Sequence, residues 1–381
     1  MNVLKKVNFT NILEFSLVLI LVTLLLGYAF NSISIGIFFL AAFFYALKNR
    51  FIIEFNQISI FFICFYCICL ISLFWTSNST ITSKGLISLI PYLLLPLGFL
   101  FISKININKK KIFDLFSKAI ALGALYSLLL GVIKSLVNHD ISYLFYHNLS
   151  NNLSNLSAIY FSVFVSFGIC YYLIKTPKSR LDYFTILFLA LFLILLSSKT
   201  IIAITIINSL ILLFWKKTKI KFILKNILIL IALLVVFIFA SKNIVNRVKV
   251  EFDKTKFNEV LSKKEFGHVY PWTGASLRVF QIKAFCEITS QQKNILLGSG
   301  LKNSQESLNN KYKEYNVYPG FLNYNYHNQY IQTIAELGIV GLLLLLLIFS
   351  SLIKRGIIKK DSFLLSFLIL IIVICITESF L

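Results

Sequence analysis

The chain has 381 residues, of which 58% are hydrophobic and only 14% are charged, and its mean hydropathy is +0.84. A soluble core of this length has no use for so much apolar surface, whereas a lipid bilayer does, so the composition excludes an ordinary soluble globular protein. The formal net charge of +22 would favour nucleic-acid binding in a soluble protein. In a membrane protein, retention of Lys and Arg on the cytoplasmic side is the first explanation to test.

Apolar runs of about 20 residues, the length that crosses a bilayer, recur along the whole chain. They predict an all-α, polytopic integral membrane protein with about 11 transmembrane helices, within a range of roughly 10 to 12. The first run follows Lys5 and Lys6 but has no small-residue cleavage site, so we interpret it as a helix and not as a cleavable signal. The predicted spans cover residues 12–30, 32–47, 57–76, 86–103, 113–137, 157–174, 182–197, 199–215, 224–241, 328–353 and 362–381.

Two patterns inside the predicted spans bear on helix shape and on metal binding. Pro91 and Pro96 fall inside the fourth span, and we expect them to kink it. Cys64, Cys67 and Cys69 have a spacing that echoes a metal site, but they lie in mid-span without a His or acidic neighbour. We therefore expect these cysteines to be packed as small apolar side chains, and we predict no metal.

The distribution of positive charge predicts the orientation of the helices. With the N-terminus in the cytoplasm, the short outer loops hold little beyond Lys84 and Lys199. The inner segments hold Lys5, Lys6, Lys48, Arg50, Lys104, Lys109, Lys110, Lys111, Lys175, Lys178, Arg180, Lys216, Lys217, Lys219, Lys221, Lys225, Lys354, Arg355, Lys359 and Lys360. This asymmetry accounts for most of the net charge without any nucleic acid.

The same orientation divides the chain into three predicted parts. Residues 1–241 form transmembrane helices one to nine, and residues 327–381 form the C-terminal transmembrane helices. Between them, residues 242–326 form one large loop with short helices on the side away from the cytoplasm. Polar residues that face this outer side are the informative ones for function, and three of them stand out.

The first is Lys199, which lies at the outer turn between the seventh and eighth spans in the run Ser197-Ser198-Lys199-Thr200. A cation at this depth needs to snorkel to the interface, to pair with an acid, or to meet an anionic ligand. A snorkelling lysine and a ligand-binding lysine are both compatible with the pattern.

The second is Arg278, within the loop. The apolar residues Leu277, Phe280, Ile282, Ala284 and Phe285 predict an amphipathic helix around it, which we expect to lie near the membrane surface. Its guanidinium is suited to bidentate phosphate binding, although a surface arginine on such a helix is the alternative. A Gly-x-Gly turn at residues 298–300 follows, which alone is weak evidence for phosphate binding.

The third is His327, immediately before the tenth span. Histidine ordinarily titrates near neutral pH, so an imidazole at the outer mouth of the helix is a candidate general base. Glu336 lies nine residues on, about 13 Å deeper at the helical rise of 1.5 Å per residue, so we do not expect it to orient His327. We expect Gly338 and Gly341 to permit close helix contact.

Together, Lys199, Arg278 and His327 place two cations and one base on the outer side, which suits a phosphate-bearing substrate anchored in lipid. His147, in the outer loop between helices five and six, is a second candidate base with a less specific context.

The run from His327-Asn328 through Tyr330, Glu336 and Gly338 to Leu342 resembles the signature of the O-antigen ligase / O-antigen polymerase superfamily of bacterial membrane glycan ligases. The order of elements is similar too, with about nine helices, then a large periplasmic loop with an Arg-bearing helix and a Gly-x-Gly turn, then the His-Asn helix. The resemblance covers the second half of the chain by motif and the first half by hydropathy. It implies a multi-pass protein of the bacterial inner (cytoplasmic) membrane.

Ligases of this superfamily transfer a glycan from undecaprenyl pyrophosphate to a sugar hydroxyl of lipid A–core, without a metal or other cofactor. The resemblance implies that Arg278 and Lys199 hold the pyrophosphate and that His327 acts on the acceptor hydroxyl. The superfamily more often has Arg where this chain has Lys199. Candidates for supporting roles are Asn328, Tyr330, Glu336 and His147.

We therefore predict metal-independent, inverting glycosyl transfer at the periplasmic face. The partners are the undecaprenyl-pyrophosphate-linked glycan, lipid A–core or another glycan acceptor, and membrane lipids, with no nucleic acid. A polymerase that joins lipid-linked repeat units shares the His-Asn helix and is the first alternative, although one large loop favours the ligase. A polysaccharide transporter or flippase and a protein O-oligosaccharyltransferase are further alternatives. A transporter is disfavoured because no inverted repeats or broken midplane helices are evident.

Overall fold

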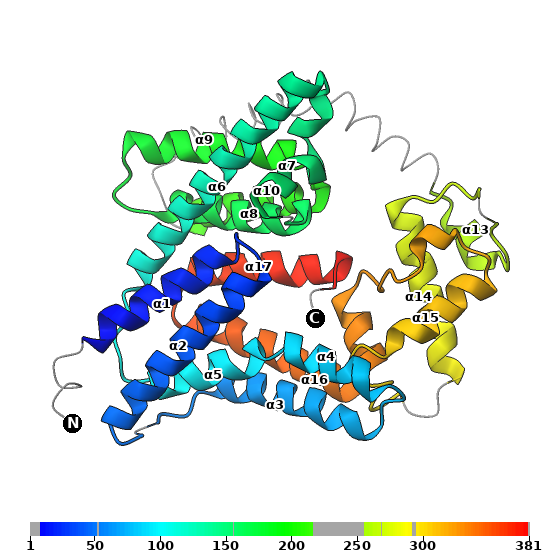
Figure 1. Cartoon of the computed structure of the whole chain (residues 1–381), viewed down its shortest axis with the longest axis horizontal. Coiled ribbons are helices and arrows are strands. Elements are labelled where there is room, and N and C mark those ends of the chain that lie inside the picture. Colours follow the sequence, from blue (N-terminus) through cyan, green and yellow to red (C-terminus); the bar gives the residue numbers. More distant parts are fainter. Residues whose placement is uncertain are drawn as a thin grey trace. The chain divides into compact units, whose positions relative to one another are not determined.

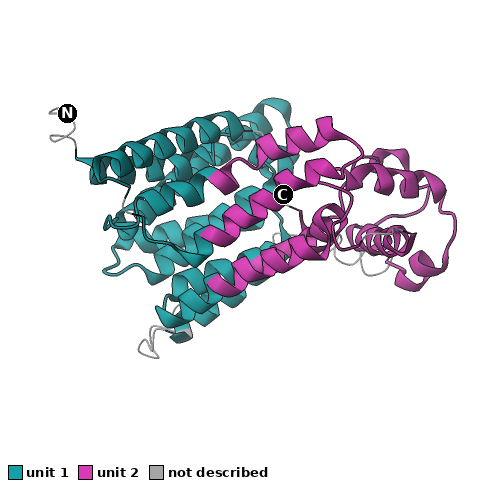
Figure 2. Cartoon of the chain, turned by 90° about the horizontal axis from the view of Figure 1, so that it is seen from below, with its two compact units in different colours: residues 1–59, 94–240, 352–371 teal, residues 60–93, 241–351, 372–381 magenta. Residues whose placement is uncertain are grey.

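The computed structural model describes residues 8–51, 53–154, 156–215, 255–267, 269–291 and 295–379. Within these ranges the chain is helical and has no β-strand, which confirms the predicted all-α class (Figure 1). The ninth predicted span, 224–241, lies outside the described residues, as do residues 242–254 of the predicted loop. The chain divides into two compact units, coloured separately in Figure 2: residues 1–59, 94–240 and 352–371, and residues 60–93, 241–351 and 372–381.

The first unit is built mainly from helices, and all of those named here except the short polar α7 are apolar. They are α1 (Phe9–Thr23), α2 (Tyr28–Lys48), α6 (Lys109–Asn138), α7 (Tyr146–Ser154), α8 (Ala158–Ile174), α9 (Arg180–Leu195) and α10 (Lys199–Trp215), with the 3₁₀ turn η3 (Ile141–Leu144). Asparagine and serine side chains start several of these helices. Asn8, Asn108 and Ser157 each accept a hydrogen bond from a backbone N–H of the first turn, which satisfies a donor that the helix itself leaves free.

Helices α1 and α2 share an apolar core. Leu13, Phe38 and Ala42 are fully buried there, together with Ile102 from the segment that follows α5 (Pro91–Phe101). Elsewhere in this unit, hydroxyl and amide groups join helices across apolar surface. Thr205 of α10 donates to Ser166 of α8 at 2.7 Å, a bond that relieves the cost of burying both hydroxyls.

The second unit contains α4 (Ser79–Ser88), most of α3 (Gln57–Ile71) with the 3₁₀ turn η2 (Ser72–Phe74), and most of α16 (Gln329–Ile358). It also contains α13 (Phe257–Ser262), α14 (Gly274–Gln291), α15 (Ser304–Glu314), the 3₁₀ turn η4 (Pro319–Phe321) and the end of α17 (Ser362–Thr377). The short helices α13, α14 and α15 lie within the predicted large loop. Its periplasmic location stays a prediction.

The helix around Arg278 is confirmed as α14, but of its predicted apolar residues only Ile282 is exposed, so most of the apolar face is not free to lie on a membrane. Leu277, Phe280 and Ala284 are buried in a core that α14 shares with the rest of the loop. This core also contains Val260, Phe266, Leu308, Tyr312, Tyr315, Val317, Tyr326 and Ala335. The expectation of a membrane-surface helix is therefore wrong for these three residues, because protein covers the face that was assigned to lipid.

Helix α16 is broken at Gly338, where the backbone has φ +67° and ψ −167°. The carbonyls of Ala335 and Glu336 accept hydrogen bonds from the N–H groups of Ser299 (3.0 Å) and Gly300 (2.8 Å). After the break, the N–H of Ile339 donates to the carbonyl of Ile295 at 3.1 Å, and the N–H of Val340 donates to that of Leu296 at 3.3 Å. The turn at 295–300 thus satisfies the backbone groups that the break exposes, as a membrane helix requires.

Length and composition identify fewer complete spans than the sequence predicts. Among the described residues, five helical segments are long and apolar enough to cross a bilayer, or six if α7 and α8, bent by 79°, form one broken span. The five are Tyr28–Lys48, Gln57–Phe74, Ser79–Phe101, Lys109–Val137 and Gln329–Ile358, and α1, Lys199–Leu213 and α17 are shorter apolar helices. The chain is a membrane protein by these helices, while the count of eleven and the orientation stay predictions.

Three predicted helix boundaries need correction. The first span, predicted as 12–30, ends early, because α1 stops at Thr23 and α2 begins at Tyr28. The fourth span is interrupted before Pro91, which begins α5, so the first proline starts a helix as its fixed φ favours, and only Pro96 lies inside one. The last span, predicted to continue to residue 381, ends at Thr377. Glu378 and Ser379 therefore lie beyond the last helical residue, although the N–H of Glu378 still donates to the carbonyl of Ile374 at 2.9 Å.

Candidate functional site

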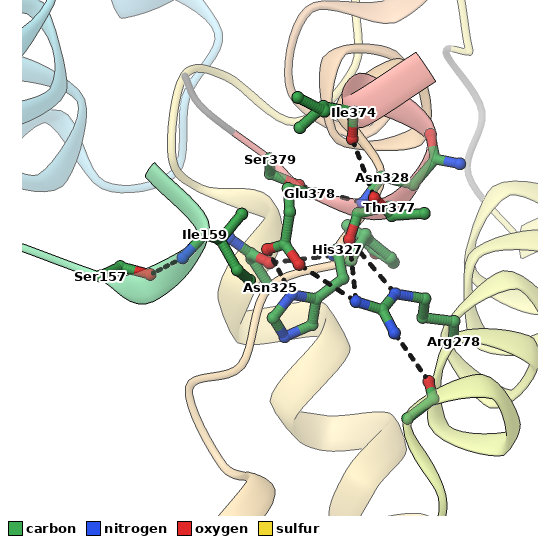
Figure 3. A network of polar contacts seen from close by, with 12 residues as sticks. Ser157, Ile159, Arg278, Asn325, His327, Asn328, Ile374, Thr377, Glu378 and Ser379 are labelled. Atoms are coloured by element: carbon green, nitrogen blue, oxygen red, sulfur yellow. Dashed lines mark hydrogen bonds and ion pairs between the residues drawn. The ribbon is translucent and has the colours of Figure 1, made fainter. Parts of the chain in front are cut away.

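Two of the three predicted site residues lie together in the second unit. Arg278 is in the second turn of α14, and His327 precedes α16. Between their side chains lies the carboxylate of Glu378, just after the end of α17 (Figure 3). Oε1 of Glu378 lies 3.1 Å from Nη2 of Arg278, and Oε2 lies 3.3 Å from Nδ1 of His327. One carboxylate therefore joins the predicted cation to the predicted base.

The guanidinium of Arg278 is fixed by the backbone as well as by Glu378. Nε and Nη2 donate to the carbonyl of Thr377 at 3.2 and 3.0 Å, and Nη1 donates to the carbonyl of Gly274 at 3.1 Å. With the bond to Glu378, these contacts leave one N–H of Nη1 without an acceptor among the described residues, since the guanidinium has five donors. The side chain is 34% exposed, so a ligand can reach it.

His327 has a left-handed backbone, with φ +44°, a conformation that is uncommon for a residue with a side chain. Side-chain acceptors hold the N–H groups around it. The N–H of Tyr326 donates to Gln332 at 3.3 Å, that of His327 to Asn325 at 2.9 Å, and that of Asn328 to Ser379 at 3.2 Å. These bonds stabilise the turn that directs the imidazole toward Glu378 (Figure 3).

The supporting candidates Asn328 and Tyr330 hold the same segments in place. Asn328 caps α16, because its side chain accepts the N–H of Ile331 at 3.0 Å. The hydroxyl of Tyr330 donates to the carbonyl of Ile372 at 2.9 Å. Both residues therefore tie the start of α16 to the last residues of the chain, where Glu378 lies. We assign them a positioning contribution and no contact with the reacting atoms.

Glu336 does not orient His327, as expected from their spacing. Its buried carboxylate accepts a hydrogen bond from Gln332 in the same helix. The Gly-x-Gly turn does not form a phosphate loop, because the N–H groups of Ser299 and Gly300 already donate to carbonyls of α16. A Cβ atom on Gly298 would lie 2.6 Å from backbone atoms of Glu336 and Gly338. The glycines at 298 and 338 therefore serve the close approach of two backbones.

Lys199 and His147 belong to the first unit. Lys199 is the first residue of α10, and its role at the pyrophosphate stays a prediction. His147 lies in α7, where its Nδ1 accepts the N–H of Ala158 at 3.4 Å at the start of α8. This contact occupies one imidazole nitrogen of His147 at a helix terminus, which favours a structural contribution over a catalytic one.

The arrangement of the second unit can support base catalysis. A carboxylate on one imidazole nitrogen favours the tautomer that carries its proton on that nitrogen, which leaves the other nitrogen as an acceptor. In His327, Nδ1 faces Glu378, so Nε2 is the atom available to accept a proton. Among the described residues no group of three or more His, Cys, Asp or Glu side chains is placed to hold a metal ion, and metal independence stays a prediction.

Glu378 is the residue that sequence reasoning missed. It lies inside the last predicted span, 362–381, which was expected to continue as a helix. A signal was present, since an acidic residue at the outer end of the last predicted span lies on the same side of the membrane as His327. Acids at such depths usually pair with a cation, and Arg278 was the cation available.

Comparison with known proteins identifies a similar family for part of the chain. Residues 184–346, which include Lys199, Arg278 and His327, match a family model described as O-antigen ligase. No curated protein matches the chain significantly. Members of the matched family are glycosyltransferase-like enzymes, and the apolar helices agree with a membrane location. Residues 184–346, less than half of the chain, thus resemble an O-antigen ligase domain, and this match supports the membrane O-antigen ligase superfamily for the protein.

Proposed function

We propose that this protein transfers a polysaccharide from undecaprenyl pyrophosphate to a sugar hydroxyl of lipid A–core, at the periplasmic face of the bacterial inner membrane. The observation that carries this proposal is the contact of one carboxylate, Glu378, with both His327 and Arg278. A base and a cation in one site match the two demands of the reaction, which are removal of a proton from the acceptor and stabilisation of an anionic leaving group.

In the proposed step, Nε2 of His327 takes the proton of the acceptor hydroxyl as its oxygen attacks the anomeric carbon. The new bond joins that oxygen to the carbon, and the bond from the carbon to the phosphate oxygen breaks. Undecaprenyl pyrophosphate leaves with the bonding electrons, and the anomeric centre is inverted because attack comes from the opposite face. Glu378 orients the imidazole and stabilises the imidazolium that forms, as a carboxylate does beside a catalytic histidine.

Arg278 contributes to the leaving-group side of the site. The N–H of Nη1 that has no acceptor among the described residues is the donor that a phosphate oxygen would meet first. Its positive charge favours the transition state, in which negative charge builds on the pyrophosphate. We assign Lys199 to the same pyrophosphate as a second cation. An ammonium provides charge without the bidentate geometry of a guanidinium, so its contribution is the less directional of the two.

A deletion strain analysed by lipopolysaccharide gel tests the proposal. We expect loss of all chains above the core, accumulation of lipid-linked polymer, and restoration by the wild-type gene. A core that carries a single repeat unit would instead indicate the polymerase, and an unchanged gel would contradict both functions. Transfer by the purified protein is expected to continue in excess EDTA, and its complete loss would contradict the metal-independent mechanism.

A further inference from the structure

An unusual series of aromatic side chains leads to His327 along the chain. Tyr318, Phe321 and Tyr324 precede the histidine at intervals of three residues. The turn η4 and the residues around it make successive i to i+3 hydrogen bonds, from Phe321 to Tyr318, from Leu322 to Pro319 and from Tyr324 to Phe321. The 3₁₀ turn itself ends at Phe321, so the contacts between the rings, and not one continuous helix, align these side chains.

The rings contact one another in order. The ring centroids of Tyr318 and Phe321 are 5.7 Å apart, those of Phe321 and Tyr324 are 5.5 Å apart, and those of Tyr324 and His327 are 5.6 Å apart. All three pairs are edge to face, which is a favourable aromatic geometry. We call Tyr318, Phe321 and Tyr324 the aromatic ladder.

Much of the aromatic ladder is accessible. Tyr318 is 50% exposed and Tyr324 is 43% exposed. By contrast, two other tyrosines of the same loop, Tyr312 and Tyr326, are buried in its core. Contiguous exposed aromatic surface usually marks an interaction site. The contact of Tyr324 with His327 makes this surface continuous with the proposed catalytic site.

The chemistry of the segment selects the partner. No Asp, Glu, Lys or Arg occurs from Tyr315 to Ala335, so the aromatic ladder has no cation of its own for a phosphate or an anionic lipid headgroup. Amide side chains lie beside it instead, with the exposed Asn323 in contact with Asn309 at 2.9 Å. Flat apolar rings beside neutral amides suit a sugar, whose C–H face packs on a ring while its hydroxyls bond to amides.

We propose that the aromatic ladder is a binding subsite for the acceptor glycan. The acceptor is favoured over the donor because Tyr324 contacts the ring of His327, the base that we assign to the acceptor hydroxyl. Arg278, which we assign to the donor pyrophosphate, bonds to one oxygen of Glu378, and His327 lies beside the other oxygen. This assignment rests on the proposed function. The subsite holds the sugar next to the attacking one, so that the reacting hydroxyl reaches Nε2 of His327.

The test compares ring-retaining and ring-removing variants of the full chain in lipid nanodiscs. Tyr318→Leu and Tyr324→Leu remove the ring but keep an apolar side chain, whereas Tyr318→Phe and Tyr324→Phe keep the ring. Transfer from lipid-linked polymer of the deletion strain to lipid A–core is measured at varied acceptor concentration. We expect each Leu variant to raise the acceptor KM about five- to tenfold, as for loss of one aromatic contact, and the Phe variants to stay near wild type.

Phe257 provides a matched control, because it is 50% exposed on α13 and belongs to the same loop but not to the aromatic ladder. Phe257→Leu is expected to leave the acceptor KM unchanged. Thermal unfolding of every variant confirms that it is folded. An acceptor KM that stays at the wild-type value in both folded Leu variants, or a rise confined to the donor KM, would overturn the subsite while leaving the proposed function intact.

A binding measurement separates this inference from the proposed function. The probe is the core oligosaccharide released from lipopolysaccharide by mild acid, observed by saturation-transfer NMR with no donor present. We expect a signal with the wild type that is lost in the double variant Tyr318→Leu/Tyr324→Leu, even in a preparation without transferase activity. Brominated lipids test the membrane as the alternative partner. The chain has three Trp residues of its own, so quenching in Tyr318→Trp that exceeds the quenching of the wild type would place this ring in the bilayer and overturn the proposal.

Discussion

Nδ1 of His327 lies 3.3 Å from Oε2 of Glu378, a residue 51 positions further along the chain. This contact makes the imidazole part of a carboxylate–histidine pair, and it connects the start of α16 to the end of α17. The same carboxylate lies 3.1 Å from the guanidinium of Arg278. Removing Glu378 therefore affects the base and the cation together, whereas removing either partner affects only one of them.

His327→Asn tests the base directly. Asparagine tolerates the left-handed backbone that His327 adopts, so the variant is expected to fold while it loses the proton acceptor. We expect kcat for glycan transfer to fall by roughly 10²- to 10⁴-fold, the contribution of a positioned general base. His139→Asn is the matched control, since His139 is also left-handed, with φ +51° at the end of α6. Near-normal transfer by His327→Asn would remove the assignment.

Glu378→Gln tests the orientation of the base. The amide is close in size to the carboxylate and carries no charge, so the imidazolium that forms during transfer loses its stabilising partner. We expect kcat to fall at least about tenfold, with a smaller loss than in His327→Asn. Thermal unfolding should change little, because the side chain of Arg278 keeps its bonds to the backbone. A Glu378→Gln variant with full kcat would show that the carboxylate does not act through His327.

Lys199 is tested by comparing the loss of its charge with a change of its shape. Lys199→Ala removes a cation from the proposed pyrophosphate site, and we expect a higher donor KM and a lower kcat. Lys199→Arg keeps the charge and adds a bidentate donor, so its transfer rate should equal or exceed that of the wild type. Lys84→Ala, which removes the other cation of the predicted short outer loops, is the control. Equal rates for all three variants would favour a snorkelling lysine.

The sequence predicted the parts of this molecule that depend on local patterns. Hydropathy located most of the helices, and residue type selected Arg278 and His327. The break at Gly338 was not predicted, because the apolar run from 339 onward continues the helical pattern of the residues before it. The break is favourable only because the turn at 295–300 hydrogen-bonds to the backbone groups that it exposes. A contact between two separate segments of the chain leaves no helical or strand periodicity in the sequence.

Glu378 was missed for a related reason. Its significance depends on where α17 ends and on which side chains lie there, and neither is encoded in the spacing of nearby residues. A helix continued to residue 381 would direct Glu378 along the helix surface. The helix ends at Thr377 instead, and the carbonyl of Thr377 accepts two hydrogen bonds from Arg278. The carbonyl at the end of the helix thus holds the guanidinium of Arg278 beside the carboxylate of Glu378.

Gly298→Ala and Gly338→Ala test the close contact between the 295–300 turn and α16. Both residues have positive φ, +68° and +67°, which costs a residue with a side chain about 1–3 kcal/mol, and an added Cβ would meet the opposing backbone. We expect a lower midpoint of thermal unfolding for each variant. Gly36→Ala, in α2 with no atom near the added Cβ, should be neutral or stabilising by about 0.5–1 kcal/mol. Wild-type unfolding of Gly338→Ala would contradict the assigned conformation.

Acid sensitivity is predicted for the contact between α14 and α15. The carboxylate of Glu287 accepts a 2.5 Å hydrogen bond from the hydroxyl of Tyr315 and lies 3.0 Å from the ammonium of Lys311. Burial opposes its ionisation, but these two partners outweigh burial and hold the pKa of Glu287 below its ordinary value. Burial and the bond to Glu287 raise the pKa of Tyr315 to about 12, so its hydroxyl remains a donor throughout the acid range.

A carboxyl whose folded pKa is lowered stabilises the fold fully above its unfolded pKa of about 4.3, and this contribution is lost as the pH falls through the folded value. We therefore expect the protection of α14 and α15 amides in the full chain against hydrogen exchange, corrected for the intrinsic exchange rate at each pH, to fall below about pH 4. Glu287→Gln should exchange faster at pH 7 and show a weaker acid dependence. Glu306→Gln, at an exposed position of α15 outside this network, is the control. An acid response that is identical in Glu287→Gln and in the wild type would show that another group controls the opening of these helices.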